Sequence, residues 1–369
     1  MSVLDIALLG DIILDVPDPD HWLSGIASVT RAADVTIAHL EVPHTRRGVE
    51  LAGDVPAPGA DPDHLAALAR AGVTAVSMAG NHIADCGAVG IADTVAELDR
   101  LGIAHAGAGG DLAAARRPAV MAVDGRRIVL LSFNCVGPEI AWATVDRAGS
   151  AYVRIAAIDG GPTRPQARLD AIDPASLVDM QTMIRAQTGP DTLVVVALHK
   201  GVTHSPATLA PYERPLAQAA IDAGADVVAS HHAHIAQGIE FHRGRPIFHG
   251  LGNGVVVTHA LSPSQDHPAR REWAERRKTM FGFEPDPAYT LAPFHPDARN
   301  GLIGRLRWHS DGNVEAGFTP LWFEAPGRPI LAKDAQGATV ARYIDTVGQS
   351  VGLAPLDLGR MTHLNCIAV

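Results

Sequence analysis

The chain has 369 residues, of which 47% are hydrophobic and 19% charged, with a formal net charge of −10. This composition provides enough apolar material for a large core and excludes a disordered chain. The negative charge argues against nucleic acid or an anionic membrane as the main partner, because binding to either requires a basic face.

The three cysteines, Cys86, Cys135 and Cys366, are too widely spaced for a disulfide framework or a thiolate zinc site. The N-terminus lacks the basic-then-apolar layout of a signal peptide, and no stretch of about 18 apolar residues is present. We therefore expect a cytoplasmic protein with no membrane span. Composition leaves oligomer formation open.

Strand-like and helical periodicities alternate along the chain. Strands are predicted at 73–78, 103–107, 127–133, 192–199 and 226–230, and helices at 63–71, 88–101, 174–187 and 212–223. Asp63 and Asp173 are the expected N-caps of two of these helices. The alternation is the signature of an α/β fold, in which sites lie at the carboxyl ends of strands.

The pattern changes after about 260 residues. Charged residues and then prolines fill 262–297, so we expect an insertion or lid at 258–300. Strands follow at 302–308 and 314–323, and a helix at 335–351. We predict one domain over 1–330, with a C-terminal helix and tail, 331–369, packed on it.

Five apolar runs each end in a residue that could bind a metal. These residues are Asp11 after 6–10, Glu41 after 35–40, Asn81 and His82 after 76–80, His199 after 193–198, and His231, His232 and His234 after 227–230. Oxygen and imidazole ligands at one edge of a sheet would form a cluster for a divalent metal.

Each of these motifs also has a plain structural interpretation. His232 and His234 could belong to a polar turn, but His199 at the end of a neighbouring strand favours a metal site. Asp11 alone could be a turn or capping residue, with Gly10 allowing a tight turn there.

A proton donor is predicted beside the metal ligands. Asn81 offers a neutral oxygen ligand, and His82 could donate a proton or hydrogen bond to a developing anion. Asp85 follows three residues later, close enough to orient His82 and raise its basicity. The alternative is a Gly-Asn turn followed by a solvent-exposed histidine.

The order of these motifs resembles the CapA family of capsule or poly-γ-glutamate synthesis proteins, within the calcineurin-like metallophosphoesterase superfamily. The resemblance runs from about residue 3 to residue 329. It rests on the segments at 10–11, 38–41, 80–87, 199–201, 223–234 and 251–253. It implies a four-layer αββα sandwich, with a two-metal site at the strand ends and the 258–300 insertion as a lid-like segment.

The resemblance also implies a role for each matching residue. One metal would take Asp11, Glu41 and His234, and the other would take Glu41, Asn81, His199 and His232. Glu41 would bridge the two metals, and His82, oriented by Asp85, would be catalytic. Asn253, Lys200 and His231 are candidates for substrate binding.

Three positions depart from the family pattern. Ile13 replaces a superfamily histidine, which leaves the first metal one ligand short. His39 replaces the usual asparagine two residues before Glu41, and it could fill that gap because residues i and i+2 of a strand face the same way. The alternative is that His39 only supports a ligand. Lys200 replaces the usual tryptophan, in a region expected to face substrate.

These features predict a metal-dependent hydrolase with two divalent ions, Mn²⁺, Fe²⁺ or Zn²⁺. Its substrate would be a small molecule or short polymer containing a phosphoester, or an amide or ester of a carboxylate. The alternative is a non-catalytic, accessory role in the synthesis of a capsule or poly-γ-glutamate polymer. Such a protein would be expected to lose ligands at several strand ends, whereas here only the position of Ile13 has lost one.

Overall fold

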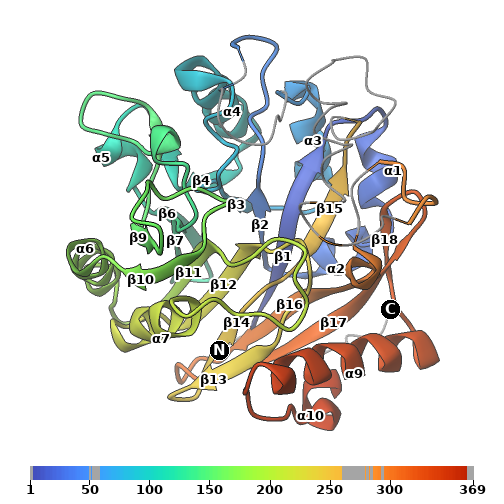
Figure 1. Cartoon of the computed structure of the whole chain (residues 1–369). Coiled ribbons are helices and arrows are strands. Elements are labelled where there is room, and N and C mark those ends of the chain that lie inside the picture. The colour runs from blue at the N-terminus through green and yellow to red at the C-terminus, as the bar shows by residue number, and fades with distance from the viewer. Residues whose placement is uncertain are drawn as a thin grey trace.

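The computed structural model describes residues 3–49, 51, 59–259, 279, 282, 286–291 and 295–363. Two large β-sheets pack face to face, and helices cover their outer faces (Figure 1). The α/β class and the four-layer αββα arrangement predicted from the sequence are therefore confirmed.

The first sheet contains the N-terminal strands and the strands that follow the insertion. Its order is β18 (Arg328–Leu331), β17 (Val314–Glu324), β16 (Asn300–Trp308), β1 (Leu4–Leu14), β2 (Val35–Leu40), β3 (Ala75–Ser77) and β4 (Ala104–Ala106). β15 (Asn253–Val257) also pairs with β1. The first half of β1 pairs with β16, and the second half pairs with β15.

The second sheet is built from the middle of the chain. Its order is β13 (Ile239–His242), β14 (Arg245–Phe248), β12 (Val227–His232), β11 (Thr192–Lys200), β7 (Arg126–Asn134) and β6 (Ala119–Val123). Two short pairs lie outside the large sheets: β5 (Ala108–Gly109) with β8 (Gly149–Ser150), and β9 (Ile155–Ala157) with β10 (Leu169–Ile172).

The predicted helices are found within two residues of their expected bounds. They are α3 (Leu65–Arg70), α4 (Gly87–Leu101), α6 (Pro174–Arg185), α7 (Glu213–Asp222) and α9 (Asp334–Ser350). The described residues also form short helices that were not predicted, α1 (Pro19–Leu23), α2 (Ala27–Ala32), α5 (Leu112–Ala115) and α10 (Leu358–His363). Asp173 caps α6 as predicted. Asp63 is not the cap of its helix, because Asp61 accepts the hydrogen bond of the Asp63 amide and starts a 3-10 turn before α3.

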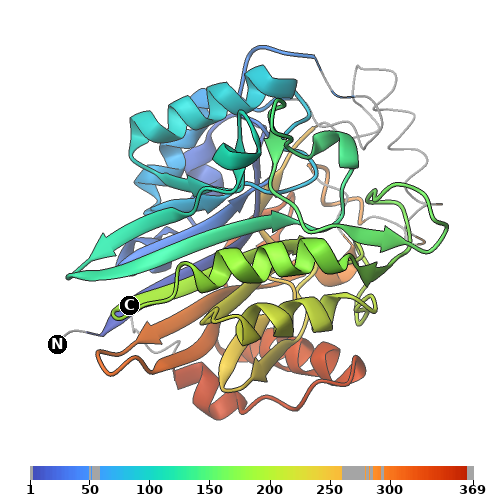
Figure 2. The ribbon, with the colours of Figure 1, turned by 90° about the vertical axis from the view of Figure 1, so that its left-hand side faces the viewer.

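Three apolar clusters separate the layers. One lies between the sheets and includes Ile37, Leu130 and Val195. A second packs α3 and α4 on the first sheet. A third packs α6 and α7 on the second sheet, where Figure 2 shows these two helices side by side. Alternation along each strand therefore decides whether a side chain points between the sheets or toward the helices.

The C-terminal helix α9 packs beside β17, where Val340 and Ile344 join the cluster between the sheets (Figure 1). The proposed lid at 258–300 lies largely outside the described residues, as do 364–369. Within the described residues, no helix is long and apolar enough to span a membrane.

Candidate metal centre

The predicted ligands converge where strands of both sheets end. β1, β2 and β3 run parallel in the first sheet, and β11 runs parallel to β12 in the second. Their carboxyl ends therefore lie at one edge of the sandwich. The candidate ligands there are Asp11, His39, Glu41, Asn81, His199 and His232, all buried, and His234, whose side chain is 14% exposed.

Asp11 is not at the end of a strand, as the sequence suggested, but at a bulge within β1. Pairing with both β2 and β15 shifts register at Asp11. Leu8 belongs to the cluster between the sheets, whereas Ile12 belongs to the outer cluster. The bulge thus reverses the alternation of side chains and turns Asp11 toward the second sheet, where its Oδ2 accepts the amide of His232 at 3.2 Å.

Gly10 is required for close approach of two strands rather than for the tight turn that we expected. A side chain at this position would overlap the carbonyl oxygen of Gly252. That carbonyl accepts the amide of Asp11 at 3.0 Å. The contact fixes the start of β15, where Asn253 lies opposite Asp11.

One group of ligands consists of Asp11, Glu41 and His234, each of which places a ligand atom within 4.8 Å of the others. Nε2 of His234 lies 3.2 Å from Oε1 of Glu41, and Nδ1 lies 3.5 Å from Oδ2 of Asp11. Nδ1 also lies 2.8 Å from Oδ1 of Asn253. Asn253 therefore contacts a candidate ligand directly.

The other group is built around His199. Nε2 of His199 lies 2.7 Å from Oδ1 of Asn81 and 3.1 Å from Nδ1 of His232. Nε2 of His199 carries at most one proton, so it cannot donate to both of these atoms. A cation bound between the three atoms would instead accept a lone pair from each. Asp11, His39 and His199 also place ligand atoms within 4.8 Å of one another. Asp11 is thus the carboxylate common to both groups.

His39 lies beside His199 in the space between the sheets. Its ring centroid is 4.5 Å from that of His199 and 4.7 Å from that of His231. Its Nδ1 lies 3.0 Å from Oγ of Ser77, which leaves Nε2 as the ligand atom.

Alternation along β2 puts Ile37 and His39 on the same inner face. The geometry places His39 with Asp11 and His199, not with the Glu41 and His234 pair that we expected it to complete.

Several buried polar atoms of this cluster have no hydrogen-bond partner among the described residues. They are Oδ1 of Asp11, Oε2 of Glu41, Nε2 of His39, Nδ1 of His199 and Nε2 of His232. Unpaired buried polar atoms are costly, so their concentration at one place requires an explanation. A divalent cation would supply the missing partner for atoms that face it.

The electrostatics of the cluster also fit a cation. Burial and the neighbouring Glu41 raise the pKa of Asp11 well above its usual range. Burial alone would also raise the pKa of Glu41, but His234 lowers it. Burial lowers the pKa of both His39 and His199, which keeps these imidazoles neutral. Against the effect of burial, Glu41 and Asp11 raise the pKa of His234 to about 9, so a positive charge is favoured beside the two carboxylates. A divalent cation would supply that charge, with the carboxylates ionised and the imidazoles neutral, which are the forms that bind metals.

The structure pairs His82 with Asp85 next to the cluster. Nδ1 of His82 lies 2.7 Å from Oδ2 of Asp85, and the His82 side chain is 11% exposed. A carboxylate at Nδ1 fixes the tautomer and the orientation of an imidazole.

Lys200 does not lie at the site, contrary to our expectation of a substrate contact. Because side chains alternate along β11, His199 faces the space between the sheets and Lys200 faces α7. The Lys200 ammonium is fully buried, 2.8 Å from the Glu213 carboxylate and 3.2 Å from the carbonyl oxygen of His249.

His231 is buried on the protein side of the ligands, away from solvent. Its ring stacks on that of His39, and its Nε2 lies 3.3 Å from the carbonyl oxygen of Leu9. Its residue exposure is only 3%, so contact with a substrate would require a movement of the residues that cover it.

His204 is a neighbour of the cluster that was not among the predicted site residues, although it lies in the region after Lys200 that was expected to face substrate. It is buried, and its ring stacks on that of His234. His204 lies in a loop between β11 and α7, where no strand or helix periodicity predicts the direction of a side chain. Only its proximity in sequence to His199 could have drawn attention to it.

Comparisons with known proteins agree with the motif order. The model of the family described as "Bacterial capsule synthesis protein PGA_cap" matches residues 5–257. A probable polyglutamine synthesis accessory protein of Mycobacterium tuberculosis is 34% identical over 240 residues, covering 63% of this chain and 59% of the relative. The capsule biosynthesis protein CapA of Bacillus anthracis is 30% identical, covering 51% of this chain and 41% of that protein.

The chain therefore spans less than two thirds of the length of these curated relatives. Among solved structures, the calcineurin-like phosphoesterase YfkN of Bacillus subtilis aligns with 95% of this chain and 97% of its own, at 12% identity and a TM-score of 0.39.

Proposed function

The chain belongs to the PGA_cap family of bacterial capsule synthesis proteins, and on that basis we propose that it is a metal-dependent hydrolase with a two-metal centre. The observation that carries the proposal is the buried cluster of carboxylate, amide and imidazole ligands from both sheets, with several unpaired atoms. Such a mixed set without thiolates suits Mn²⁺, Fe²⁺ or Zn²⁺.

The ligands divide into two positions. Asp11, Glu41 and His234 would hold one ion. Asn81, His199 and His232 would hold the other, joined by His39. The resemblance assigns the bridge to Glu41, whereas Asp11 is the carboxylate common to both groups in this structure. Two divalent ions bound here would activate a water and polarise the bond under attack.

His82 would serve as the general acid. Its Nδ1 is engaged by Asp85, so Nε2 is the nitrogen that would pass a proton to the leaving group. Asp85 would hold the ring in place and stabilise its protonated form. Asn253 would orient His234 through the contact with Nδ1.

The proposed substrate is a small molecule or short polymer with a phosphoester, or with an amide or ester near a carboxylate. The names of the relatives, which refer to polyglutamine synthesis and to capsule biosynthesis, favour the carboxylate-containing class. The ligand cluster itself is compatible with both classes.

An accessory role in polymer synthesis is the second candidate. It is favoured by the description of the mycobacterial relative as an accessory protein. Loss of catalysis would be expected to leave the cluster degraded, whereas the predicted ligands come together here. The hydrolase is therefore the better-supported function.

The test combines metal analysis with a hydrolysis screen. Purified protein would be analysed by mass spectrometry for bound metal and then assayed with Mn²⁺ or Zn²⁺ against phosphomonoesters, phosphodiesters, esters and γ-glutamyl amides. We expect bound metal and turnover in one class, both lost in Asp11→Asn. Metal binding without turnover on any panel would favour the accessory role, and a folded protein that binds no metal would contradict both the metal centre and the hydrolase.

A further inference from the structure

The loop at 201–212, between β11 and α7, brings His204 against the metal centre. The ring of His204 stacks on that of His234, with centroids 5.4 Å apart and planes inclined by 20°. The backbone amide of His204 donates to the carbonyl oxygen of Ala233 at 2.9 Å, next to His234 in the chain. His204 is therefore held in place twice, by its ring on His234 and by its backbone amide on Ala233.

His234 needs such a neighbour more than the other proposed ligands do. Its two nitrogens are aligned by Asn253 at Nδ1 and Glu41 at Nε2, contacts that act only at the edge of the ring. It lies beyond the end of β12 with φ of 55°, and its side chain is 14% exposed. Stacking on the ring face by His204 supplies the restraint on tilt that the edge contacts leave open.

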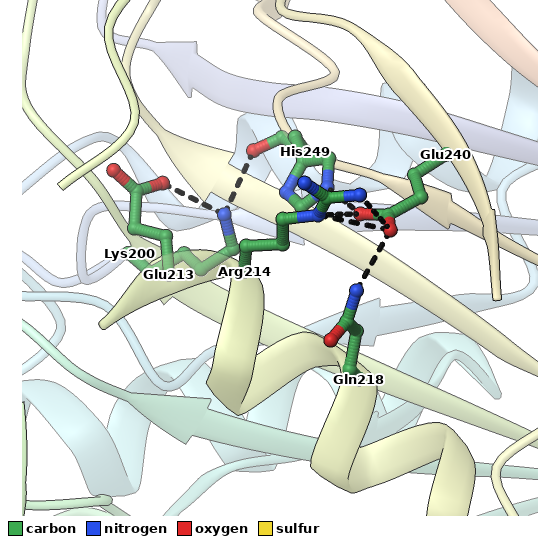
Figure 3. A network of polar contacts seen from close by, with 6 residues as sticks. All are labelled: Lys200, Glu213, Arg214, Gln218, Glu240 and His249. Carbon is green, nitrogen blue, oxygen red and sulfur yellow. Dashed lines mark hydrogen bonds and ion pairs between the residues drawn. The ribbon is translucent and has the colours of Figure 1, made fainter. Parts of the chain in front are cut away.

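The loop that carries His204 is closed by a buried ion pair. Lys200 immediately precedes the loop and Glu213 immediately follows it, and their side chains, both 0% exposed, meet at 2.8 Å (Figure 3). The second carboxylate oxygen of Glu213 accepts the amide of Ala210 at 2.6 Å. The amide of Gly201 donates to the hydroxyl of Tyr212 at 2.9 Å. Both ends of the loop are thus held together.

A polar network ties this closure to the rest of the second sheet. Lys200 also donates to the carbonyl oxygen of His249, whose Nε2 lies 3.0 Å from Glu240 (Figure 3). Glu240 accepts hydrogen bonds from Arg214 and Gln218 of α7. The network joins β11, β13 and α7. It therefore restrains both ends of the loop that carries His204.

We propose that His204 is a positioning residue of the metal centre, which holds the imidazole of His234 in the plane needed to bind a metal ion. The inference rests on the proposed function, because it takes His234 as a ligand. It adds a residue whose ring lies face to face with that of His234. Because the stack carries this effect, the effect should depend on an aromatic ring at position 204.

Titration calorimetry with Mn²⁺ tests the proposal on the full chain. We compare the wild type with His204→Ala, which removes the stack, and His204→Phe, which keeps an aromatic face. His242→Ala, at the end of β13 and paired with Asp222, is the matched control for loss of a histidine elsewhere. Thermal unfolding of the metal-free proteins checks that each variant is folded.

We expect His204→Ala to weaken Mn²⁺ binding about 3- to 10-fold, the usual range for loss of an aromatic pair. His204→Phe and His242→Ala should bind like the wild type. Equal binding by the wild type and a folded His204→Ala would overturn the positioning role, as would equal losses in the Ala and Phe variants. A folded wild type that binds no Mn²⁺ would instead overturn the proposed function, and the role of His204 with it.

Discussion

Two histidines of the centre, His39 and His82, commit the same ring nitrogen to the protein but differ in their partner and in their exposure. His39 uses Nδ1 for Ser77, and His82 uses Nδ1 for Asp85. The first is buried among ligands, whereas the second is partly exposed next to them. A nitrogen engaged by the protein directs the other toward metal or substrate. This difference separates a proposed ligand from a proposed acid.

Replacing His82 by alanine separates these roles experimentally. We expect the His82→Ala variant to keep its bound metal and to lose about 10²- to 10⁴-fold in kcat, the usual contribution of a general acid. Metal content and steady-state rates measured on the same sample test this. Loss of metal in the variant would show that His82 is a ligand instead.

Gly80 is a second residue whose identity the centre requires. A Cβ atom at this position would lie 2.9 Å from Nε2 of His39 and 3.4 Å from Cε1 of His199. His39 cannot easily move away, because its ring is packed between those of His199 and His231.

We therefore expect Gly80→Ala to lower the free energy of unfolding by about 1–3 kcal/mol, as overpacking does, and to weaken metal binding. Urea unfolding and Mn²⁺ titration would measure the two effects. Gly110→Ala is the control, because a Cβ there would meet no atom within 4 Å. Similar behaviour of the two variants would refute the steric account.

At the scale of elements, the strands were easier to predict than the way they present their side chains. Apolar runs and glycine stops revealed most strands and helices, and the residues at 41, 81 and 199 do lie where strands finish. The bulge at Asp11 was not predictable, because it arises when β15, far away in sequence, pairs with the second half of β1.

Dependence on distant parts of the chain also explains why Lys200 was wrongly predicted to bind substrate. Its position next to His199 suggested the site, but adjacent residues of a strand face opposite sides. Its partner Glu213 lies on α7, and nothing local in the sequence connects the two. Their pairing depends on how α7 packs on the second sheet.

The buried pair predicts a specific pattern of stabilities. Lys200→Met leaves the Glu213 carboxylate buried without its counter-charge, so we expect a loss of about 3–5 kcal/mol in the free energy of unfolding. Adding Glu213→Gln removes that charge while an amide oxygen can still accept from Ala210. The double variant should therefore be more stable than Lys200→Met in urea unfolding, and an equal or lower stability would argue against the buried ion pair.

At the scale of the whole molecule, the centre joins the two sheets. Asp11, His39 and Glu41 come from the first sheet and its edge, whereas His199 and His232 come from the second. A cation bound between them would add a link that the apolar cluster between the sheets does not provide. It would also offset the repulsion between the two buried carboxylates.

Metal removal should therefore destabilise the folded protein as a whole. We expect a chelator to lower the Tm and Mn²⁺ to restore it, with a shift that grows with the concentration of free metal, as for any ligand that binds only the folded state. Differential scanning calorimetry measures this. A Tm that is unchanged by chelator and by added metal would mean that no ion links the sheets.

The central claim is that the ligand cluster holds two divalent ions, and anomalous scattering from crystals grown with Mn²⁺ tests it most directly. We predict two anomalous peaks, one among Asp11, Glu41 and His234 and the other beside His199 with His39 in contact. Anomalous maps with no peak at these residues would contradict the metal centre, and a single peak would contradict the two-metal assignment.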